Sequence, residues 1–415
     1  MNAEIIAIGS ELLTPFRQDT NSLHLTAKLN ELGVEVDFKT VVGDRRAHLV
    51  TAARIAFSRA AIIIFMGGLG PTEDDLTREA VAEALGLELK RDAEIAAALF
   101  AFFASRKVKM PENNLRQADV IAGAEALKNP RGTAPGQFLQ TEFEGSQKII
   151  MLLPGPPREI LPMFDQQCME RLRSLVPARH IATRVLKIAM IGESDADRRA
   201  APIYKQHTDI ETTILASTGG EIQIHLRSQA ATPDEARKKV DALASLLEDE
   251  FDEALFSAHG ETLEQIVGYY LQMRGASLAA AESCTGGMLS ERLTSVPGSS
   301  RYFLGGAVVY DNSLKTALAE VPPLMIAEHG AVSREVAMAL AEGIRKRCKA
   351  TFGVGITGIA GPGGGSEEKP VGLVFHALAD GKTTDVIERR FPGDRDRVRH
   401  WASQQALDMI RRKLM

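Results

Sequence analysis

The stretch LAAAESCTGGMLSERL, residues 278–293, determines how the last third of the chain folds. A short apolar run is followed by a polar turn, a Gly-Gly pair and a helical pattern, which predicts strand, turn and helix. Ligands of open α/β sheets bind beyond the carboxyl ends of strands, and free N–H groups at a helix start hold a phosphate or an oxyanion. The candidate site residues of this turn are Glu282, Ser283, Cys284, Thr285, Gly286 and Gly287.

A second predicted strand end supplies a partner for a serine nucleophile. The segment GGAVVYDNSLK, residues 305–315, places Tyr310 at the end of the strand and Lys315 about one helical turn into the next element. A lysine in an apolar pocket loses its proton more easily and can then deprotonate a hydroxyl. Serine with lysine is a known alternative to the Ser-His-Asp triad.

Cys284 is a rival nucleophile, because a thiol is intrinsically stronger than a hydroxyl. No histidine stands out as its partner, since His329 and His376 lie in segments without other catalytic features. We rank Ser283 above Cys284, although the periodicity of the sequence alone does not decide between them.

Two more strand ends complete this constellation. GITGIAGPGGG, residues 355–365, is a loop whose glycines allow close approach of a ligand to the backbone. FPGDRDRVRHWA, residues 391–402, carries arginines near a helix start, an arrangement suited to bidentate phosphate contacts. Each feature alone has an ordinary structural reading as a cap, a turn or a surface residue. Four of them at strand ends favour a ligand site, whose further residues are Thr357, Gly358, Gly361, Arg395 and Arg399.

Composition narrows the classes of protein to be considered. The 415 residues are 45% hydrophobic and 25% charged, and the net charge is -5. There is no global attraction to nucleic acid or anionic membrane, and the single tryptophan and few other aromatic residues disfavour base-stacking surfaces. Three widely spaced cysteines indicate a reducing compartment. No signal-peptide pattern or membrane-length apolar run is present, so we expect a cytoplasmic protein without membrane or direct nucleic-acid partners.

The pattern of strands and helices predicts an α/β fold with three sections. Residues 1–173 alternate strands and helices, with strands at 4–8, 34–42, 61–66 and 148–153, which implies a mostly parallel sheet. Residues 178–258 form a small α+β module with a hairpin around Gly219-Gly220. Residues 261–415 return to α/β alternation. In the first section we expect Asn21 to be the N-cap of a helix.

The first section also predicts a ligand site, here with a metal. A buried strand runs into GGLGPTEDD, residues 67–75, where glycines permit close approach to a phosphate and adjacent carboxylates can hold Mg²⁺. LLPGPPREI, residues 152–160, repeats the arrangement with Glu159 just inside a helix. The alternative reading of adjacent aspartates before a helix is simple capping. The predicted divalent metal ligands are Asp74, Asp75 and Glu159.

The last section resembles the CinA C-terminal domain family through AESCTGG, GGAVVYDNSLK, TGIAGPGGG and KPVG, the last at residues 369–372. That family includes nicotinamide mononucleotide deamidases. The resemblance implies that Ser283 is the nucleophile, that Tyr310 and Lys315 activate it, and that one of two arginines, Arg395 or Arg399, holds the 5'-phosphate. The implied reaction hydrolyses the carboxamide to the acid and ammonia without a cofactor.

The first section resembles the molybdopterin-binding fold at the front of CinA proteins, which is associated with metal-dependent ADP-ribose pyrophosphatase activity. The match includes GSELL, DTN, VGD, GGLGPTEDD, NPRGTAPG and PGPPRE, but Pro15 departs from the ELL-x-G pattern of many relatives. The implied substrate-binding residues are Gly67, Gly68, Gly70, Thr72, Asn129 and Gly132. The middle section resembles a KH-like domain, but its GES and STGG segments provide no GXXG nucleic-acid clamp.

The leading hypothesis is a two-activity enzyme of pyridine-nucleotide salvage. Its C-terminal domain would deamidate nicotinamide mononucleotide, and its N-terminal domain would hydrolyse ADP-ribose. One alternative keeps a single active domain, another is a non-catalytic nucleotide-binding adaptor in competence or DNA-damage response, and a third is molybdopterin biosynthesis. The expected partners are small-molecule nucleotides and, from the resemblance, a second copy in a homodimer.

Overall fold

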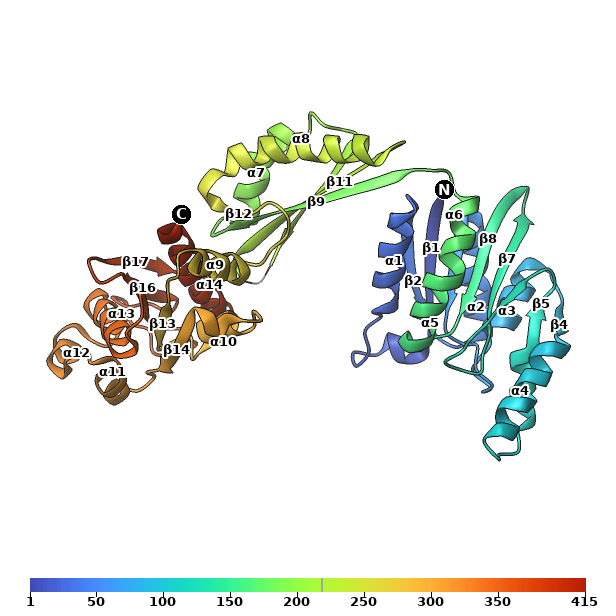
Figure 1. Cartoon of the computed structure of the whole chain (residues 1–415), viewed down its shortest axis with the longest axis horizontal. Coiled ribbons are helices and arrows are strands. Elements are labelled where there is room, and N and C mark those ends of the chain that lie inside the picture. Colours follow the sequence, from blue (N-terminus) through green and yellow to red (C-terminus); the bar gives the residue numbers. More distant parts are fainter. Residues whose placement is uncertain (218) are drawn as a thin grey trace. The chain divides into compact units, whose positions relative to one another are not determined.

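Alternating strands and helices build two units, which the computed structural model describes over residues 1–217 and 219–415 (Figure 1). One unit comprises residues 1–181 and 229–236, and the other comprises residues 182–228 and 237–415. Thr218, in the predicted STGG turn, lies outside the described residues. The predicted α/β fold class is confirmed. In the described part of the chain, no helix is both long and apolar enough to cross a membrane.

The first unit is built on a sheet with strand order β2-β1-β3-β8-β7-β6. β1, β2, β3 and β8 are parallel, whereas β7 and β6 continue the sheet with antiparallel pairing. The strands are β1 (Asn2–Ile8), β2 (Glu35–Val42), β3 (Ile62–Met66), β6 (Glu125–Leu127), β7 (Gly136–Phe143) and β8 (Ser146–Leu153). The helices are α1 (Asn21–Glu31), α2 (Arg46–Arg59), α3 (Thr77–Leu85), α4 (Ala93–Ser105), α5 (Pro157–Met163) and α6 (Met169–Leu175). β4 (Leu89–Arg91) pairs separately with β5 (Asp119–Ile121).

Both faces of this sheet are buried by helices. Ile5 belongs to the core that includes α1, α5 and α6, whereas its neighbour Ile6 belongs to the core that includes α2 and α3. A strand that is covered by helices on both sides has a continuous run of apolar residues, as β3 has with IIIFM. The prediction of Asn21 as N-cap is wrong, because Thr20 occupies that position and the Asn21 amide instead donates to the Gly155 carbonyl, 2.8 Å away.

The second unit contains a sheet with order β10-β11-β9-β12, whose inner face packs against two helices. Its elements are β9 (His180–Ala189), α7 (Glu193–Tyr204), β10 (Ile210–Ala216), β11 (Glu221–Ala230), α8 (Pro233–Phe251) and β12 (Leu255–Ser257). β10 and β11 pair antiparallel, with Ala216 opposite Ile222. The predicted hairpin is therefore present.

The C-terminal sheet has the order β14-β13-β15-β16-β17. β13, β14 and β15 are parallel, β16 reverses, and β17 reverses again. The carboxyl ends of β13, β14, β15 and β17 consequently lie at one edge, which brings the four segments singled out in the sequence to the same side. The strands are β13 (Leu278–Glu282), β14 (Phe303–Val308), β15 (Phe352–Gly358), β16 (Leu373–Ala379) and β17 (Thr384–Arg390).

Helices cover both faces of this sheet (Figure 1). α9, α10 and α14 contribute to the core on one face, and α11 and α13 to the core on the other. A Cβ atom at Gly355 of β15 would lie 2.3 Å from the Ala337 carbonyl oxygen, so glycine there lets α13 pack directly on the strand. The helices are α9 (Leu263–Met273), α10 (Met288–Thr294), α11 (Asn312–Ala319), α12 (Pro323–His329), α13 (Arg334–Cys348) and α14 (Arg395–Leu414).

A buried arginine fixes the last turns of α14. The Arg411 guanidinium donates to the Asp408 carboxylate at 2.7 Å and also to the carbonyls of Glu253 and Leu255, just before and within β12. Arg411 and Asp408 are almost completely buried. Without Arg411, the buried Asp408 keeps Arg412 as an ionic partner but loses two hydrogen bonds, and the carbonyls of Glu253 and Leu255 lose their donor. Breaking a buried ion pair by removing one partner costs more than the pair itself contributes.

We therefore expect Arg411→Ala to lower the free energy of unfolding of this unit by about 3–5 kcal/mol. The matched control is Arg198→Ala, because Arg198 is 73% exposed and pairs with Asp195 at the surface of the same unit; its loss costs about 1 kcal/mol or less. Urea titration followed by fluorescence of Trp401, which lies in α14, measures both values. Equal, small effects of the two substitutions would contradict this account.

Candidate functional sites

The turn that carries the candidate nucleophile Ser283 is positioned by the register of three strands. Glu282 of β13 pairs with Val308 of β14 on one side and with Ile356 of β15 on the other. The Ser283 amide continues this pairing by donating to the Ile356 carbonyl at 2.9 Å, and the Val309 amide donates to the Glu282 carbonyl at 2.8 Å. Ser283 therefore lies between the ends of β14 and β15, and its side chain is buried.

Lys315 is a buried amine at the neighbouring strand end. Its Nζ donates to the carbonyls of Val309 and Tyr310, at 3.0 and 3.1 Å. Burial lowers the pKa of Lys315 below its ordinary value, and the nearby Asp311 only partly opposes this. In its neutral form this amine has two hydrogens, which match the two carbonyls, and one lone pair, which would be free to accept a proton. The Ser283 hydroxyl makes no hydrogen bond to this amine within the described residues, but catalytic hydrogen bonds often form only with substrate bound.

The environment of the rival nucleophile Cys284 keeps its thiol protonated. It is 5% exposed, and burial raises the pKa of its thiol to about 12. Since the thiolate is the reactive form, this cysteine is a poor nucleophile near neutral pH. The environment favours Ser283.

Glu282, predicted to bind substrate, has its carboxylate engaged within the protein. Its carboxylate accepts hydrogen bonds from the amides of Leu289 and Ser290, at 2.9 and 2.8 Å, and from the Ser290 hydroxyl at 2.7 Å. Glu282 is 1% exposed. The first turn of α10 is therefore occupied by the protein's own anion and cannot serve as the phosphate site that the sequence suggested.

Thr285 is also structural. Its side chain is fully buried, and its carbonyl accepts hydrogen bonds from Nε and Nη2 of Arg399, at 3.1 and 3.0 Å. Thus Arg399 braces the turn. Gly286 and Gly287 have φ values of 62° and 93°, a conformation that glycine adopts without strain. They shape the turn that presents Ser283.

Arg395 connects two of the predicted loops and is exposed. It donates to the Gly361 carbonyl at 2.8 Å and to the Tyr310 hydroxyl at 2.7 Å. Tyr310 is 56% exposed, so both groups lie at the open side of the site. Of the two candidate phosphate ligands, Arg395 is the accessible one.

Thr357 and Gly358 belong to β15 rather than to the Gly-rich loop. The Thr357 hydroxyl donates to the Ala331 carbonyl at 2.7 Å. A Cβ atom on Gly358 would lie 2.6 Å from the Leu373 carbonyl oxygen, so this glycine serves the packing of β15 on β16. The prediction that Gly358 contacts the ligand is not supported by its position.

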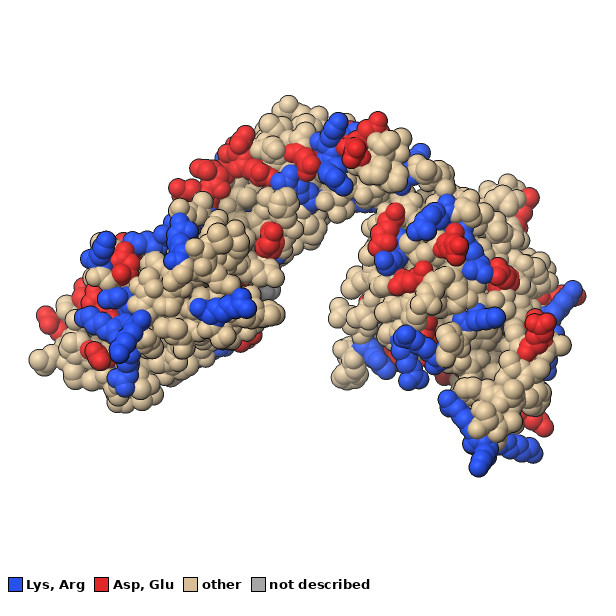
Figure 2. All heavy atoms as spheres, viewed as in Figure 1, with Lys and Arg blue, Asp and Glu red and all other residues tan. Residues whose placement is uncertain are grey.

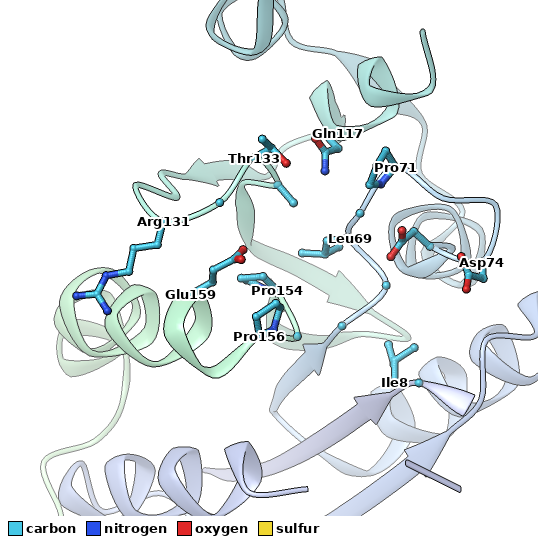
Figure 3. Close-up of a pocket in the computed structure, with 18 of the residues that line it drawn as sticks. Ile8, Leu69, Pro71, Asp74, Gln117, Arg131, Thr133, Pro154, Pro156 and Glu159 are labelled. Atoms are coloured by element: carbon cyan, nitrogen blue, oxygen red, sulfur yellow. The ribbon is translucent and has the colours of Figure 1, made fainter. Parts of the chain in front are cut away.

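The first unit has a cavity of about 820 Å³ at the carboxyl ends of its parallel strands (Figure 3). Three loops contribute most of its walls, at residues 67–71, 131–134 and 154–159. Its volume is within the range of small-molecule sites. Of the residues predicted from the sequence, the structure places in its lining Gly67, Gly68, Gly70, Asp74, Asp75, Gly132 and Glu159.

Buried arginine holds the glycine-rich loop, a role that was not predicted from the sequence. Arg78 of α3 is 1% exposed, and its Nη atoms donate to the carbonyls of Leu69 and Gly70 at 2.7 and 3.0 Å. Gly67 and Gly68 have φ values of 103° and 66°, which expose the loop backbone to the cavity. The loop is thus fixed before any ligand arrives.

The three predicted metal ligands share the cavity but do not cluster. No group of three or more His, Cys, Asp or Glu side chains suited to a metal ion occurs among the described residues. Figure 3 shows Glu159 and Asp74 on opposite sides. Asp75 accepts hydrogen bonds from the amide and hydroxyl of Thr72, at 2.9 and 2.5 Å, so both residues are engaged within the loop. Asp74 keeps an exposed carboxylate, which suits Mg²⁺ held by one protein carboxylate and the phosphates of a substrate.

Glu159 is positioned by Asn129, which the sequence had suggested as a substrate ligand. The Asn129 amide donates at 2.8 Å both to Glu159 and to the Ala134 carbonyl. A Cβ atom on Gly132 would lie 2.1 Å from the Glu159 carboxylate, so glycine is required for this approach. Asn129 therefore orients a carboxylate, with both hydrogens of its amide engaged within the protein. Pro15 lies outside the cavity lining, which takes Gly9 and Glu11 from this segment.

The helix α4 and its cationic end were absent from the sequence prediction. Phe102, Phe103 and Arg106 line the cavity. Figure 2 shows Lys and Arg side chains gathered at this end of the unit, where Arg106, Lys107 and Lys109 are exposed. The available signal was the apolar run AEIAAALFAFFAS followed by basic residues. Arg131 and Arg158 add positive charge to the lining.

Comparisons with known proteins agree with this architecture of two α/β domains. Residues 4–174 match the family described as "Probable molybdopterin binding domain", and residues 260–414 match the CinA C-terminal domain. The chain is 63% identical to a CinA-like protein of Koribacter versatilis over the full length of both chains. It is 50% identical to one of Solibacter usitatus, with all of this chain and 98% of the relative covered. The chain therefore belongs to the CinA family.

A solved structure, the competence/damage inducible protein CihA from Agrobacterium tumefaciens, is 37% identical to the matched part. The match covers 37% of this chain and 96% of that chain, with a TM-score of 0.35.

The capping role of Glu282 yields a direct test. We expect Glu282→Ala to expose the amides of Leu289 and Ser290 to exchange and to destabilise the domain by about 3 kcal/mol, because one buried and two part-buried donors lose a charged acceptor. Hydrogen exchange of the peptide 283–294, read by mass spectrometry, measures the local effect. Glu291→Ala is the control, since Glu291 is exposed on the same helix. Unchanged protection in Glu282→Ala would refute the assigned role.

Proposed function

We propose that the C-terminal domain is an amidase that hydrolyses the carboxamide of nicotinamide mononucleotide. The observation that carries this proposal is the buried Lys315, whose pKa is lowered by burial and whose Nζ donates to two carbonyls at the strand end next to Ser283. The choice of nicotinamide mononucleotide as the substrate rests on the resemblance of the sequence motifs to the CinA C-terminal domain family.

In this proposal the Ser283 oxygen attacks the carboxamide carbon and its proton passes to Lys315. The C–N bond then breaks, ammonia leaves with the proton from Lys315, and an ester on Ser283 remains. Water hydrolyses the ester, which releases the carboxylic acid and restores the serine. Arg395 faces the 5'-phosphate, and the amides of Thr285 and Gly287 are the candidate donors to the oxyanion, since Glu282 occupies those of α10.

For the first unit we propose hydrolysis of the diphosphate bond of ADP-ribose and similar compounds, with ADP-ribose as the reference substrate. The cavity combines cations, suited to phosphate, with Asp74, suited to a divalent metal. A bound Mg²⁺ would neutralise phosphate charge. Glu159, held by Asn129, is positioned to orient water. Cytoplasmic location and homodimer formation stay predictions.

Substitution at the serine–lysine pair tests the amidase proposal. We expect Ser283→Ala and Lys315→Met each to lower kcat for ammonia release from nicotinamide mononucleotide by about 10³-fold or more. Ser295→Ala and Lys346→Met, at exposed positions, should keep full activity. EDTA should have no effect. An active Ser283→Ala variant would eliminate the proposed nucleophile.

The pH dependence of kcat/KM follows from the lowered pKa of Lys315. Because the base must be unprotonated, the rate should rise as the pH increases through that pKa, with a midpoint below the ordinary value of 10.5. Initial rates in overlapping buffers measure the profile. A value of kcat/KM that falls as the pH rises through this range would contradict a lysine base.

Metal-dependent release of AMP from ADP-ribose tests the N-terminal proposal. We expect EDTA to abolish it and Asp74→Asn to reduce it about 100-fold without loss of stability, because the Asp74 side chain is exposed. Asp75→Asn should also destabilise the loop, since it loses its bonds from Thr72. Glu73→Gln is the control, because the Glu73 side chain is fully exposed. Full activity of Asp74→Asn would remove Asp74 from the metal site.

A further inference from the structure

Helix α14 carries at its start two arginines that contact the candidate amidase site. Arg399 donates to the Thr285 carbonyl from Nε and Nη2, at 3.1 and 3.0 Å. Arg395 donates to the Gly361 carbonyl at 2.8 Å. The position of the first turns of α14 therefore determines where the turn that carries Ser283 is held.

Trp401, close behind Arg399 in α14, packs this part of the helix onto the domain. Its ring lies beside the Phe391 ring, with centroids 5.9 Å apart, and against the apolar core of the C-terminal domain. The buried indole Nε1 has no hydrogen-bond partner within the part of the chain that the structure describes. The ring is therefore held by packing, and its position depends on the shape of the surfaces that enclose it.

One of these surfaces is the turn between β10 and β11, which belongs to the α+β module. A Cβ atom on Gly220 would lie 2.8 Å from both Cδ2 and Cε3 of Trp401, closer than a Cβ atom can pack. The backbone of the turn thus rests directly on the indole ring. Gly220 has a φ of 80°, so glycine serves both the turn and the contact.

This turn is itself fixed to the C-terminal domain. The Gly220 carbonyl accepts a hydrogen bond from the Met190 amide at 3.1 Å. Ala189, at the end of β9, is 1% exposed and belongs to the same apolar core as Trp401. At the far end of α14, Arg411 donates to carbonyls of the segment 253–255. The α+β module therefore contacts α14 at two levels, about 15 Å apart along the helix.

We propose that Gly220 and Trp401 are positioning residues for the amidase site. The turn of the α+β module holds the Trp401 ring against the C-terminal core, and the ring holds the first turns of α14. Arg399 transmits this position to the turn that carries Ser283. The inference rests on the proposed amidase activity only for its catalytic consequence. The alternative is a contact that adds stability and leaves the geometry of the site unchanged.

Gly220→Ala in the full chain tests this proposal, because the added methyl group must displace the Trp401 ring. We expect kcat for ammonia release from nicotinamide mononucleotide to fall about 10- to 100-fold, the effect of misplacing a reacting group by about 1 Å. Hydrogen exchange of the peptide 283–294 should become about tenfold faster, because the turn loses its brace. Gly219→Ala is the matched control in the same turn, since its Cβ would meet only the Ser217 hydroxyl oxygen, at 3.9 Å.

A second substitution separates displacement of the ring from strain in the turn. Trp401→Phe removes the six-membered ring of the indole, which the new methyl group would meet. The double variant Gly220→Ala/Trp401→Phe should therefore recover to the activity and exchange of Trp401→Phe alone. Strain at a φ of 80° would not be relieved by a smaller ring. If Gly220→Ala does not fold, Trp401→Phe alone decides, because it loosens the same contact and should lower kcat severalfold.

Wild-type kcat and exchange in Gly220→Ala would overturn the proposal, as would a double variant no more active than Gly220→Ala. Wild-type values in Trp401→Phe would do the same where only that variant folds. If the wild-type chain releases no ammonia, the amidase proposal fails, and exchange of the peptide 283–294 still decides this one. Faster exchange in Gly220→Ala that Trp401→Phe reverses would then uphold the positioning role.

Discussion

The buried carboxylate of Glu282 is the interaction on which the C-terminal site depends. It joins the end of β13 to the start of α10, so that strand, turn and helix form one rigid piece. The register of β13 with both neighbouring strands then places Ser283 beside the carbonyls that hold Lys315. With these constraints in place, the strand ends that carry Ser283 and the carbonyls bound to Lys315 are fixed before any substrate binds, as the proposed pairing of nucleophile and base requires.

In the N-terminal unit, a buried cation fixes the loop at the candidate site. Arg78 fixes the carbonyls of the glycine-rich loop, and Asn129 fixes the carboxylate of Glu159 on the other side of the cavity. In both units, several polar side chains that the sequence suggested as ligand-binding residues instead hold the loops of the candidate site in place. Fewer side chains are therefore free to contact a ligand than the sequence suggests.

Much of the fold could be predicted because apolar runs and turn residues mark the strands. The predicted strands at residues 34–42 and 61–66 coincide within one residue with β2 and β3. The roles of Glu282, Thr285 and Asn129 could not be predicted, because an internal hydrogen bond depends on which segments meet in space. The helix α4 was missed because its sequence AEIAAALFAFFAS is almost wholly apolar and lacks the helical alternation of apolar and polar residues. In the structure many of these residues, Phe100 included, stay accessible.

If Ser283 is the nucleophile, it carries the substrate as a covalent ester during amide hydrolysis. The most direct measurement is intact-protein and peptide mass spectrometry after rapid acid quenching of the enzyme with nicotinamide mononucleotide. The account predicts an adduct of the substrate less ammonia on the peptide that contains Ser283, and its absence from Ser283→Ala. Rapid turnover with no adduct at any quench time, or an adduct on Cys284, would contradict it.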